Sequence, residues 1–566
     1  MMDSDIVDEA FDFVVVGSGA GSMCAALWMR AMGKSVVIVE KDALIGGTTA
    51  RSGGTMWIPC NRFLAEDGVV DSDDLAMAYL DATVGLSENA PAANRERRHT
   101  YVVEAPRMLE FLIDSGIRLH RLKNYPDYYD ERPGGLAEGR VVVADLFDIS
   151  RLGPWADKLR PGFLPVPASH EEIYWLPMAM RSWRGLKAGL KLMARMVAAR
   201  MQGARWVTAG AALQGRMLEA ALANGVDIRV ASPVSSLVEK NGRICGVVAT
   251  SGEHQFTIGA RLGVLVNAGG FAQNSHMRRR YMADGSARWT AAGAIDSGEM
   301  IEEMQRLGAA VAQMDGLLGS PMGIPSGAEN RGDGVDILKA SGQPDLAKPH
   351  AIVVDGTGVR YMNEGGSYVE TCQNMRDRHR KTPAIPSWLI VDRQYMRKYM
   401  LCGTIPRTRA RRRLLATGFV RQAPTIEALE AKIGAEPGHL VETIRRFNAD
   451  VRKGKDTQFG RGARIFDRWS GDALSRTSPA LGTIERPPFY AIEIVPGDVG
   501  TSGGVVTDAS ARVLRDDGSP IDGLYATGTS AASVMGRYAP GAGSSIGPSL
   551  LWAYVAAKHA CADPSR

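Results

Sequence analysis

The stretch from Phe11 to Glu40 constrains the fold of this chain more than any other. A short apolar run at 11–16 leads directly into the glycine-rich turn Gly17-Ser18-Gly19-Ala20-Gly21-Ser22, and a helical pattern follows. A second apolar run, at 35–39, ends at Glu40. A strand, a glycine-rich turn, a helix, a second strand and an acidic residue in this order predict a dinucleotide-binding βαβ unit.

Each part of this unit has a task in holding a dinucleotide. Gly17 permits the tight turn, and Gly19 lets the backbone approach a pyrophosphate. The helix that follows directs free N–H groups and its positive dipole end at the phosphates. Ser22 replaces the third glycine of the fingerprint and is small enough for close packing of helix on strand. Glu40 is placed to accept hydrogen bonds from ribose hydroxyls, and its charge argues against a 2′-phosphate.

Further glycine-rich stretches predict a flavin rather than a nicotinamide cofactor. Residues 46–54 read GGTTARSGG, and so many small residues let the backbone lie against a flat ring without side-chain clashes. The apolar run at 262–266 ends in Asn-Ala-Gly-Gly-Phe, which resembles a return to the first sheet. Near the end of the chain, residues 536–547 lead into a helical run at 548–560, whose free N–H groups would face the flavin.

The chain is too long for one core, so more than one domain is expected from its 566 residues. Strand-and-glycine patterns occupy both ends, whereas residues 274–490 carry more polar loops and prolines. We therefore predict an α/β protein with a Rossmann-like FAD-binding domain built from residues 1–273 and 491–566. An α+β substrate domain, residues 274–490, is inserted between them. Residues 227–230, 234–239 and 244–250 are expected to form a small β-meander.

Composition limits the other classes of function. A net charge of +5 with an isoelectric point of about 8.8 is too small an excess to predict nucleic-acid binding. The six cysteines are scattered without a C-x-x-C pair, which indicates reduced thiols and no metal site. The acidic start, residues 1–10, lacks a secretion signal, and no apolar run is long enough to span a membrane. These features predict a cytoplasmic protein.

Residues 173–206 form a basic segment of unusual composition. No acidic residue occurs between Glu172 and Glu219. Basic residues recur at helical spacing beside an apolar stripe, with tryptophans at 175, 183 and 206. Two interpretations stay open. The stripe packs on its own domain, or residues 175–201 make peripheral contact with an anionic membrane surface.

The chain resembles the FAD-dependent 3-ketosteroid dehydrogenases, especially the Δ1 enzymes, within the fumarate reductase and succinate dehydrogenase flavoprotein superfamily. The resemblance covers nearly the whole chain. It is carried by the N-terminal turn, by residues 48–54, by Tyr-Pro-Asp-Tyr-Tyr at 125–129 with Pro-Gly-Gly at 133–135, and by residues 362–370 and 523–547. Several separated motifs in one order are more specific than any single motif.

The resemblance implies a division of labour in desaturating ring A of a 3-ketosteroid. In the family, a backbone N–H and a tyrosine hold the keto oxygen, a second tyrosine supported by a third removes a proton beside the carbonyl, and flavin N5 takes a hydride. Matched position by position, Tyr368 abstracts the proton, Tyr128 supports it and Gly543 supplies the N–H.

One position departs from the family's pattern. The Δ1 enzymes have their keto-polarising tyrosine where this chain has Ala539, and here Tyr538 precedes it. A Tyr-Ala pair before a small turn resembles the Δ4 enzymes instead. The overall resemblance favours Δ1-dehydrogenation, the local pattern favours Δ4, and Tyr538 is predicted to polarise the ketone.

Two further functions remain as alternatives: a fumarate-reductase-type reductase that uses Arg537, and a flavin-binding protein without turnover. The chain has no second dinucleotide fingerprint, so its electron acceptor is expected to be external, a quinone or another carrier. Together, motifs and resemblance predict these cofactor-binding residues: Gly17, Ser18, Gly19, Ala20, Gly21, Glu40, Lys41, Gly47, Thr48, Thr49, Ser52, Gly53, Gly54, Ala268, Gly269, Gly528, Ser544, Ser545 and Ile546.

Overall fold

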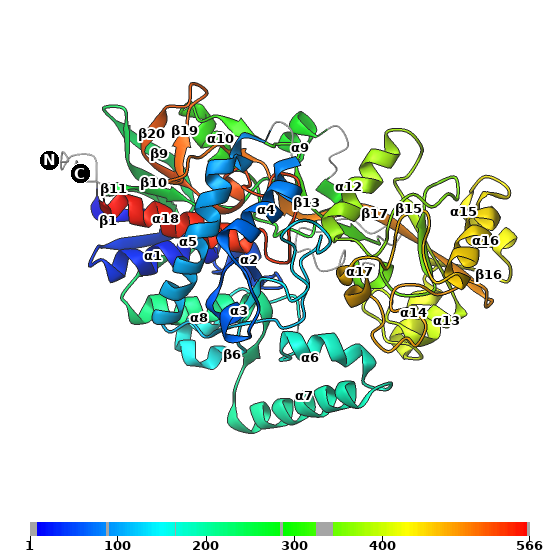
Figure 1. The fold of residues 1–566 in the computed structure, drawn as a ribbon. Helices are drawn as coiled ribbons and strands as arrows, with labels where there is room; N and C mark the ends of the chain where they lie inside the picture. Colours follow the sequence, from blue (N-terminus) through cyan, green and yellow to red (C-terminus); the bar gives the residue numbers. More distant parts are fainter. Residues whose placement is uncertain (1–7, 87–89, 165, 283–286, 324–342, 563–566) are drawn as a thin grey trace.

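The computed structural model describes residues 8–86, 90–164, 166–282, 287–323 and 343–562 (Figure 1). Most of the acidic start of the chain, residues 1–7, therefore lies outside the described residues. Among the described residues the largest sheet has eight strands, in the order β19-β20-β10-β11-β1-β2-β8, with β9 paired to β10. The strands are β1 (Glu9–Val16), β2 (Val36–Val39), β8 (Asp227–Arg229), β9 (Val234–Lys240), β10 (Arg243–Ser251), β11 (His254–Val266), β19 (Arg512–Leu514) and β20 (Pro520–Ala526).

The centre of this sheet is parallel and is built from both ends of the chain. Val16 of β1 pairs with Val39 of β2 on one side and with Val266 of β11 on the other. β20 runs parallel to the last residues of β11, so a strand near the C-terminus completes the sheet. Alternate side chains of β1, such as Val14 and Val15, enter two separate buried cores. Burial on both faces explains the unbroken apolar runs, and the strands predicted at 11–16, 35–39 and 262–266 are confirmed.

The predicted β-meander is wrong in its first strand. β9 and β10 pair antiparallel as expected, but β8 pairs parallel with β2, with Ile228 opposite Ile38. Helix α8 (Ala209–Ala223) immediately precedes β8. A strand that follows a crossover helix joins the edge of a parallel sheet, which explains why β8 lies beside β2 instead of β9.

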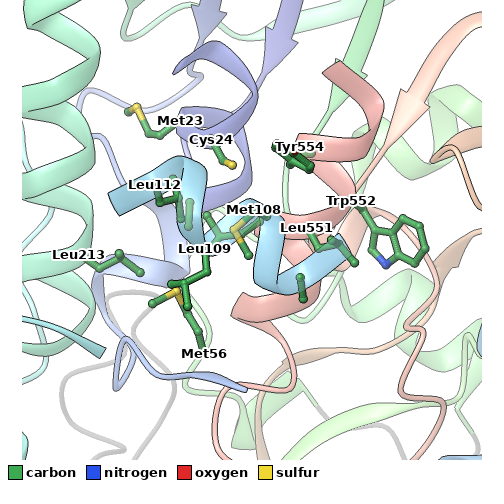
Figure 2. Close-up of a cluster of buried hydrophobic side chains, with 14 of the residues drawn as sticks. Met23, Cys24, Met56, Met108, Leu109, Leu112, Leu213, Leu551, Trp552 and Tyr554 are labelled. Atoms are coloured by element: carbon green, nitrogen blue, oxygen red, sulfur yellow. The ribbon is translucent and has the colours of Figure 1, made fainter. Parts of the chain in front are cut away.

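Helices cover one face of the large sheet and form the largest core with it. α1 (Ala20–Ala31), α5 (Arg95–Asp114), α8 and α18 (Ile546–Ala562) supply more than a third of its buried side chains. Figure 2 shows where α1, α5 and α18 meet, with Met23 and Cys24, Met108, Leu109 and Leu112, and Leu551, Trp552 and Tyr554. Each large apolar side chain buried there contributes about 1.5–3 kcal/mol.

A second sheet forms the other large part of the molecule (Figure 1). Among the described residues it has five strands, in the order β13-β17-β15-β14, with β16 also paired to β17. The strands are β13 (Leu317–Met322), β14 (Ala351–Val354), β15 (Ser387–Asp392), β16 (Val420–Ala423) and β17 (Phe489–Thr501). The helices around it are α12 (Tyr368–His379), α13 (Arg393–Lys398), α14 (Arg409–Ala416), α15 (Ile426–Ile433), α16 (His439–Arg452) and α17 (Ile465–Ser470).

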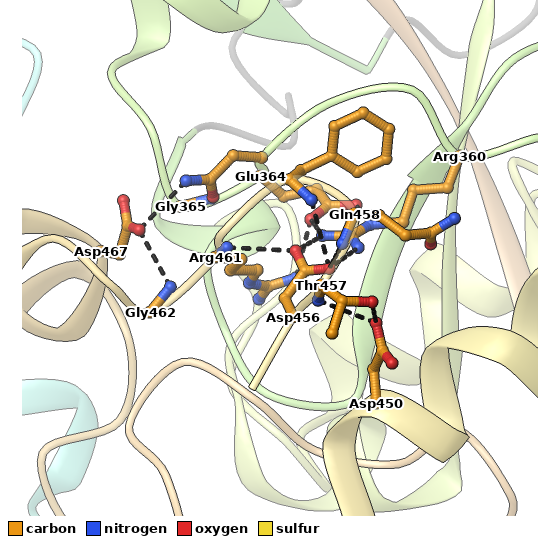
Figure 3. A network of polar contacts seen from close by, with 12 residues as sticks. Arg360, Glu364, Gly365, Asp450, Asp456, Thr457, Gln458, Arg461, Gly462 and Asp467 are labelled. Carbon is orange, nitrogen blue, oxygen red and sulfur yellow. Dashed lines mark hydrogen bonds and ion pairs between the residues drawn. The ribbon is translucent and has the colours of Figure 1, made fainter. Parts of the chain in front are cut away.

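A buried network of charges holds this second part together (Figure 3). Arg360 donates to both carboxylate oxygens of Glu364, at 2.8 and 2.7 Å, and to both of Asp456, at 2.8 Å each. Arg461 donates to Glu364 at 3.1 Å. Burial opposes ionisation of Glu364, but the two guanidinium groups hold its pKa below the usual range. The loop that leads to Tyr368 is therefore fixed by ion pairs that water does not reach.

The remaining elements are short or connect these two parts. The helices are α2 (Gly47–Ala50), α3 (Arg62–Glu66), α4 (Asp73–Thr83), α6 (His170–Trp175), α7 (Trp183–Gln202), α9 (Ser275–Tyr281), α10 (Glu299–Arg306) and α11 (Gln343–Leu346). The strands are β3 (Met56–Trp57), β4 (Leu119–Arg121), β5 (Val141–Ala144), β6 (Phe147–Asp148), β7 (Trp206–Val207), β12 (Val311–Ala312) and β18 (Gly504–Val505). Within the described ranges, no helix is both long enough and apolar enough to cross a bilayer.

The contact between α1 and α18 provides a test of the packing. A Cβ on Gly21 would lie 2.5 Å from the carbonyl oxygen of Ser549, which belongs to the backbone of α18 and cannot swing aside. We expect Gly21→Ala to lower the free energy of unfolding by about 1–3 kcal/mol. The matched control is Gly189→Ala in α7, where a Cβ meets only Ala179 at 4.0 Å. That variant should be neutral or gain up to about 1 kcal/mol of stability. Thermal unfolding measures both, and equal effects would mean that the contact between Gly21 and α18 does not limit the size of the side chain there.

Candidate functional site

A cavity of about 530 Å³ lies at the carboxyl ends of the parallel strands of the large sheet. Its lining includes Val16 and Val39, the last residues of β1 and β2, and Asn267, which directly follows β11. The helices α1 and α18 begin at the cavity, and Tyr368 at the start of α12 lines it as well. Ligands of open parallel sheets bind at this edge, where helix N-termini supply free N–H groups.

The N-terminal turn explains why glycine and serine are needed there. Gly17 has φ +95°, and a Cβ on it would strike the carbonyl oxygen of Asn267. Ser18 donates to Oε2 of Glu40 twice, from its hydroxyl at 2.6 Å and from its N–H at 3.0 Å. The N–H of Asp42 donates to the other carboxylate oxygen at 2.9 Å. Glu40 is therefore held in place at the cavity with lone pairs left for a ligand, although burial raises its pKa.

Sixteen of the nineteen predicted cofactor-binding residues line this cavity. Ala20, Gly21 and Gly54 do not, because each is needed for packing behind the cavity wall. Ala20 is the buried first residue of α1, and Gly21 lies against α18. Gly54 has φ +65°, and a Cβ on it would lie 2.5 Å from the backbone of α8. A position can require a small residue either for close packing or for the approach of a ligand. The sequence alone does not show which of the two applies.

Three polar residues of the cavity, Asn267, Asp296 and Glu299, are not among the residues predicted from the sequence. The side-chain amide of Asn267 donates to the hydroxyl of Ser22 at 2.9 Å and so ties β11 to α1. Lys41 forms an ion pair with Glu299, and both residues line the cavity. Asp296 accepts a hydrogen bond from the N–H of Gly270 at 2.5 Å. The available signal was Asp-Ser-Gly at 296–298, a typical turn before a helical run.

Two predicted catalytic tyrosines are in contact at the far end of the cavity. The rings of Tyr128 and Tyr368 lie edge to face with centroids 5.7 Å apart, and the Tyr128 hydroxyl is close enough to lower the pKa of Tyr368. Tyr125 is a second tyrosine close to Tyr128, and it raises the pKa of Tyr128. Tyr368 lines the cavity, whereas Tyr128 lies behind it.

The electrostatics of the pair distinguish the two hydroxyls. Burial raises the pKa of Tyr368, and the hydrogen bond with Tyr128 lowers it. Burial raises the pKa of Tyr128 far above its usual range, and its two tyrosine neighbours raise it further. In addition, Tyr368 is the first residue of α12, whose positive end favours a phenolate. Tyr368 is therefore the member of the pair that loses a proton more readily.

The loop that carries Tyr128 is fixed to the turn before α18. The carbonyl oxygen of Pro540 accepts from the N–H of Tyr128 at 3.0 Å and from the hydroxyl of Tyr79 at 2.6 Å. The neighbouring Asp127 accepts from the indole N–H of Trp57 at 2.8 Å and pairs with the buried Arg140. The loop that carries Tyr128 is thus held through Tyr128 by Pro540 and through Asp127 by Trp57 and Arg140.

The turn at 536–547 brings the other predicted catalytic residues to the cavity. Tyr538, Ala539 and Gly543 all line it. Gly543 has φ +96°, and a Cβ on it would lie 2.5 Å from the backbone of Met56, so only glycine fits. Within the described part of the chain, the N–H of Gly543 donates to no protein acceptor. Arg537 points the other way and pairs with Asp315 at the surface, at 2.6 Å.

The comparisons with known proteins agree with this geometry. Residues 12–546 match the family model described as an FAD binding domain. The 3-oxosteroid 1-dehydrogenase of Mycobacterium tuberculosis is 36% identical over 573 residues, which cover 97% of this chain and 98% of that protein. The solved structure of 3-ketosteroid Δ1-dehydrogenase from Sterolibacterium denitrificans, in complex with 1,4-androstadiene-3,17-dione, is 32% identical with a TM-score of 0.87. The match covers 98% of this chain and 100% of that one.

A second solved structure shares the fold. The 3-ketosteroid-Δ4-(5α)-dehydrogenase from Rhodococcus jostii RHA1 superposes with a TM-score of 0.67 at 20% identity, over 99% of each chain. At 20% identity this similarity shows a shared fold and nothing further.

Asp296 gives the cavity a dependence on pH that can be measured. Burial raises the pKa of its carboxyl to about 6. Between pH 4 and 6 the folded chain thus binds a proton there that the unfolded chain has lost, so this group's contribution to stability falls as pH rises through that window. Asp296→Asn keeps an acceptor for Gly270 without the charge. As the pH rises from 4 to 7, the free energy of unfolding of the variant should rise by about 2–3 kcal/mol relative to that of wild type. Urea unfolding of the apoprotein measures the difference, and a constant difference would contradict the assignment.

Proposed function

Because the chain belongs to the FAD-dependent 3-ketosteroid dehydrogenases of the fumarate reductase and succinate dehydrogenase flavoprotein superfamily, we propose that it desaturates ring A of a 3-ketosteroid. Its cofactor is FAD, and it is an oxidoreductase that acts on CH–CH groups. One observation carries the proposal. Tyr368, whose ring packs edge to face on that of Tyr128 with centroids 5.7 Å apart, lines the same cavity as Gly543.

The residues present in the cavity fit FAD. A Cβ on Gly17 would strike the backbone, which keeps the turn before α1 open to a pyrophosphate. Glu40 has lone pairs left for ribose hydroxyls, and the turn from Ser544 to Ile546 presents the start of α18 to a ring system. FAD would then be held by residues from both chain ends. When bound, it supplies a hydride acceptor at N5.

The protein's own part is to move a proton and hold the ketone. A C–H beside a carbonyl is weakly acidic, so the charge that develops on the oxygen must be stabilised as the proton leaves. We assign the N–H of Gly543 and the hydroxyl of Tyr538 to that oxygen. Tyr368 takes the proton, and Tyr128 stabilises the resulting phenolate through its hydrogen bond.

The position of desaturation is proposed as C1–C2, with C4–C5 as the alternative. The relative of 36% identity and the structure of TM-score 0.87 are both Δ1 enzymes by name, which favours Δ1. The Tyr538-Ala539 pair at the cavity favours Δ4, because it resembles the Tyr-Ala pair of the Δ4 enzymes. Ala539 has no hydroxyl, so Tyr538 is the residue of the pair that could polarise the ketone. A reductase of small diacids has less support, since Arg537 pairs with Asp315 at the surface.

The partners follow from the same proposal. The substrate is a 3-ketosteroid, and the reduced cofactor passes its electrons to an external acceptor, a quinone or another carrier. Residues 175–201 make peripheral contact with a membrane. That contact would place the protein beside the phase in which both steroids and quinones dissolve.

The role of Tyr368 is tested by removing its hydroxyl alone. Tyr368→Phe keeps the ring, so FAD and steroid should still bind, while anaerobic reduction of the flavin by a 3-ketosteroid should slow by about 10²-fold or more. Tyr128→Phe should also slow it, by less, because Tyr128 does not line the cavity. The control is Tyr395→Phe, a buried tyrosine whose hydroxyl donates to the carbonyl of Asp345 at 2.9 Å. Reduction at the wild-type rate by Tyr368→Phe would refute the assignment.

The role of Tyr538 is tested separately, together with the position of the new double bond. Tyr538→Phe should slow flavin reduction by removing one of two donors to the keto oxygen, at a cost of about 2–4 kcal/mol. The wild-type enzyme should convert a Δ4-3-ketosteroid to its 1,4-diene. If instead it desaturates only a saturated 3-ketosteroid, at C4–C5, the Δ4 alternative is correct. An unchanged rate in Tyr538→Phe would mean that this tyrosine only packs.

A further inference from the structure

Helix α7 (Trp183–Gln202) lies at one edge of the molecule and is attached through the short helix α6 and the turn that follows it, Leu176–Met178 (Figure 1). Only Gly185 and Ala188 of its twenty residues are buried. Of the sixteen large apolar side chains exposed among the described residues, nine lie between Met180 and Trp206. The interpretation in which the apolar stripe packs on its own domain is therefore wrong.

The sequence of α7 gives the helix three distinct sides. The buried side packs towards α6 and the turn after it through Gly185 and Ala188. The exposed apolar side follows the spacing i, i+3, i+7, i+10, i+14 and i+18. Its members are Trp183, Leu186, Leu190, Met193, Val197 and Met201, which are 41–82% exposed. Between these two sides runs a row of basic residues, Arg184, Lys187, Lys191 and Arg195.

The four basic residues do not have the same task. Arg195 pairs with both carboxylate oxygens of Glu172, at 2.7 and 3.0 Å, and so fastens α7 to α6. Arg184 lies over the ring of Trp175 at 5.3 Å. Lys187 and Lys191 are exposed, and neither forms an ion pair with any described residue. These two lysines are the charges available to an external partner.

We propose that the exposed apolar side of α7, with Lys187 and Lys191 along its rim, rests in the headgroup region of an anionic lipid bilayer. Apolar and aromatic side chains on one side with lysines beside them are the pattern of an interfacial helix. The rim is cationic and the segment from 173 to 218 contains no acidic residue, so lipid phosphates complement it. A second copy of this face would instead bring lysine rims together without acidic partners.

The membrane-facing segment is connected to the cavity by a row of aromatic rings. Tyr174 of α6 stacks on Trp469 with ring centroids 5.3 Å apart. The ring centroid of Trp469 lies 4.2 Å from that of Tyr125 and 6.0 Å from that of Phe466. The ring centroid of Phe466 in turn lies 4.7 Å from that of Tyr128. His170, at the start of α6, is hydrogen-bonded at 2.7 Å to the carbonyl of Gly53, which lines the cavity. Anchoring α7 thus places this side of the cavity next to the lipid.

The anchoring stands apart from the chemistry, and only the identity of the ligand that enters from the lipid rests on the proposed function. The test uses the full-length, FAD-loaded protein and two sets of vesicles, phosphatidylcholine alone and an equal mixture with phosphatidylglycerol. Wild type should co-sediment with the mixed vesicles, and the binding should weaken as salt rises. Lys187→Glu with Lys191→Glu should reduce the affinity by about 30-fold or more. Leu190→Ser with Met193→Ser should also reduce it.

The matched controls make the same changes elsewhere. Lys453→Glu with Lys455→Glu alters two exposed lysines beyond α16, and Val70→Ser with Ile405→Ser alters two exposed apolar residues. Both should bind vesicles as wild type does, and all variants should keep wild-type flavin reduction by dissolved steroid. Equal binding by the Lys187/Lys191 variant and wild type would overturn the proposal. So would a wild-type dimer that Leu190→Ser with Met193→Ser converts to monomer without a change in vesicle binding. Loss of steroid turnover in wild type with vesicle binding intact would refute the proposed function alone.

Discussion

The close approach of three backbone segments around Asn267 is the constraint on which the rest of the structure depends. Its N–H donates to the carbonyl of Val16, its carbonyl excludes a side chain on Gly17, and its amide reaches Ser22. On the other side, the same side chain would clash with a Cβ on Gly528. The N-terminal turn and the C-terminal turn therefore fit against one asparagine, and both depend on glycine to do so. The cavity exists because these segments meet there without side chains between them.

At the far end of the cavity, burial and hydrogen bonding act on the tyrosines in opposite directions. Burial alone would keep both hydroxyls protonated, since a phenolate in an apolar site is costly. The neighbouring Tyr128 hydroxyl lowers the pKa of Tyr368, and the start of α12 also favours the charged form at Tyr368. Two identical side chains thus differ in how readily they lose a proton, because they occupy different positions. Buried ion pairs around Arg360 hold the loop that leads to Tyr368, and those around Arg140 hold the loop that carries Tyr128. The two tyrosines therefore keep their different environments.

The parts of the fold that depend on local pattern could be predicted from the sequence. The strands at 11–16, 35–39 and 262–266 are apolar runs that the pattern places, although β11 already begins at His254. The place of β8 could not be predicted, because three residues carry too little pattern to choose between β2 and β9. Gly21 and Gly54 were assigned to the cofactor because small residues serve packing and ligand contact alike. Asp296 and Glu299 reach the cavity only through tertiary structure, because the Asp-Ser-Gly sequence at 296–298 predicts a turn but not the direction in which its acidic residue faces.

The position of β20 has a consequence for how the chain folds during synthesis. β11 ends at Val266, and the strand that pairs with its last residues begins only at Pro520. At translation rates of about 5–20 residues per second, this edge of a buried parallel sheet lacks its neighbour for roughly 10–50 seconds. An unpaired apolar edge is a template for association with other nascent chains. The edge stays unpaired until β20 has been synthesised, and the cavity lacks part of its lining until residues 528–549 follow.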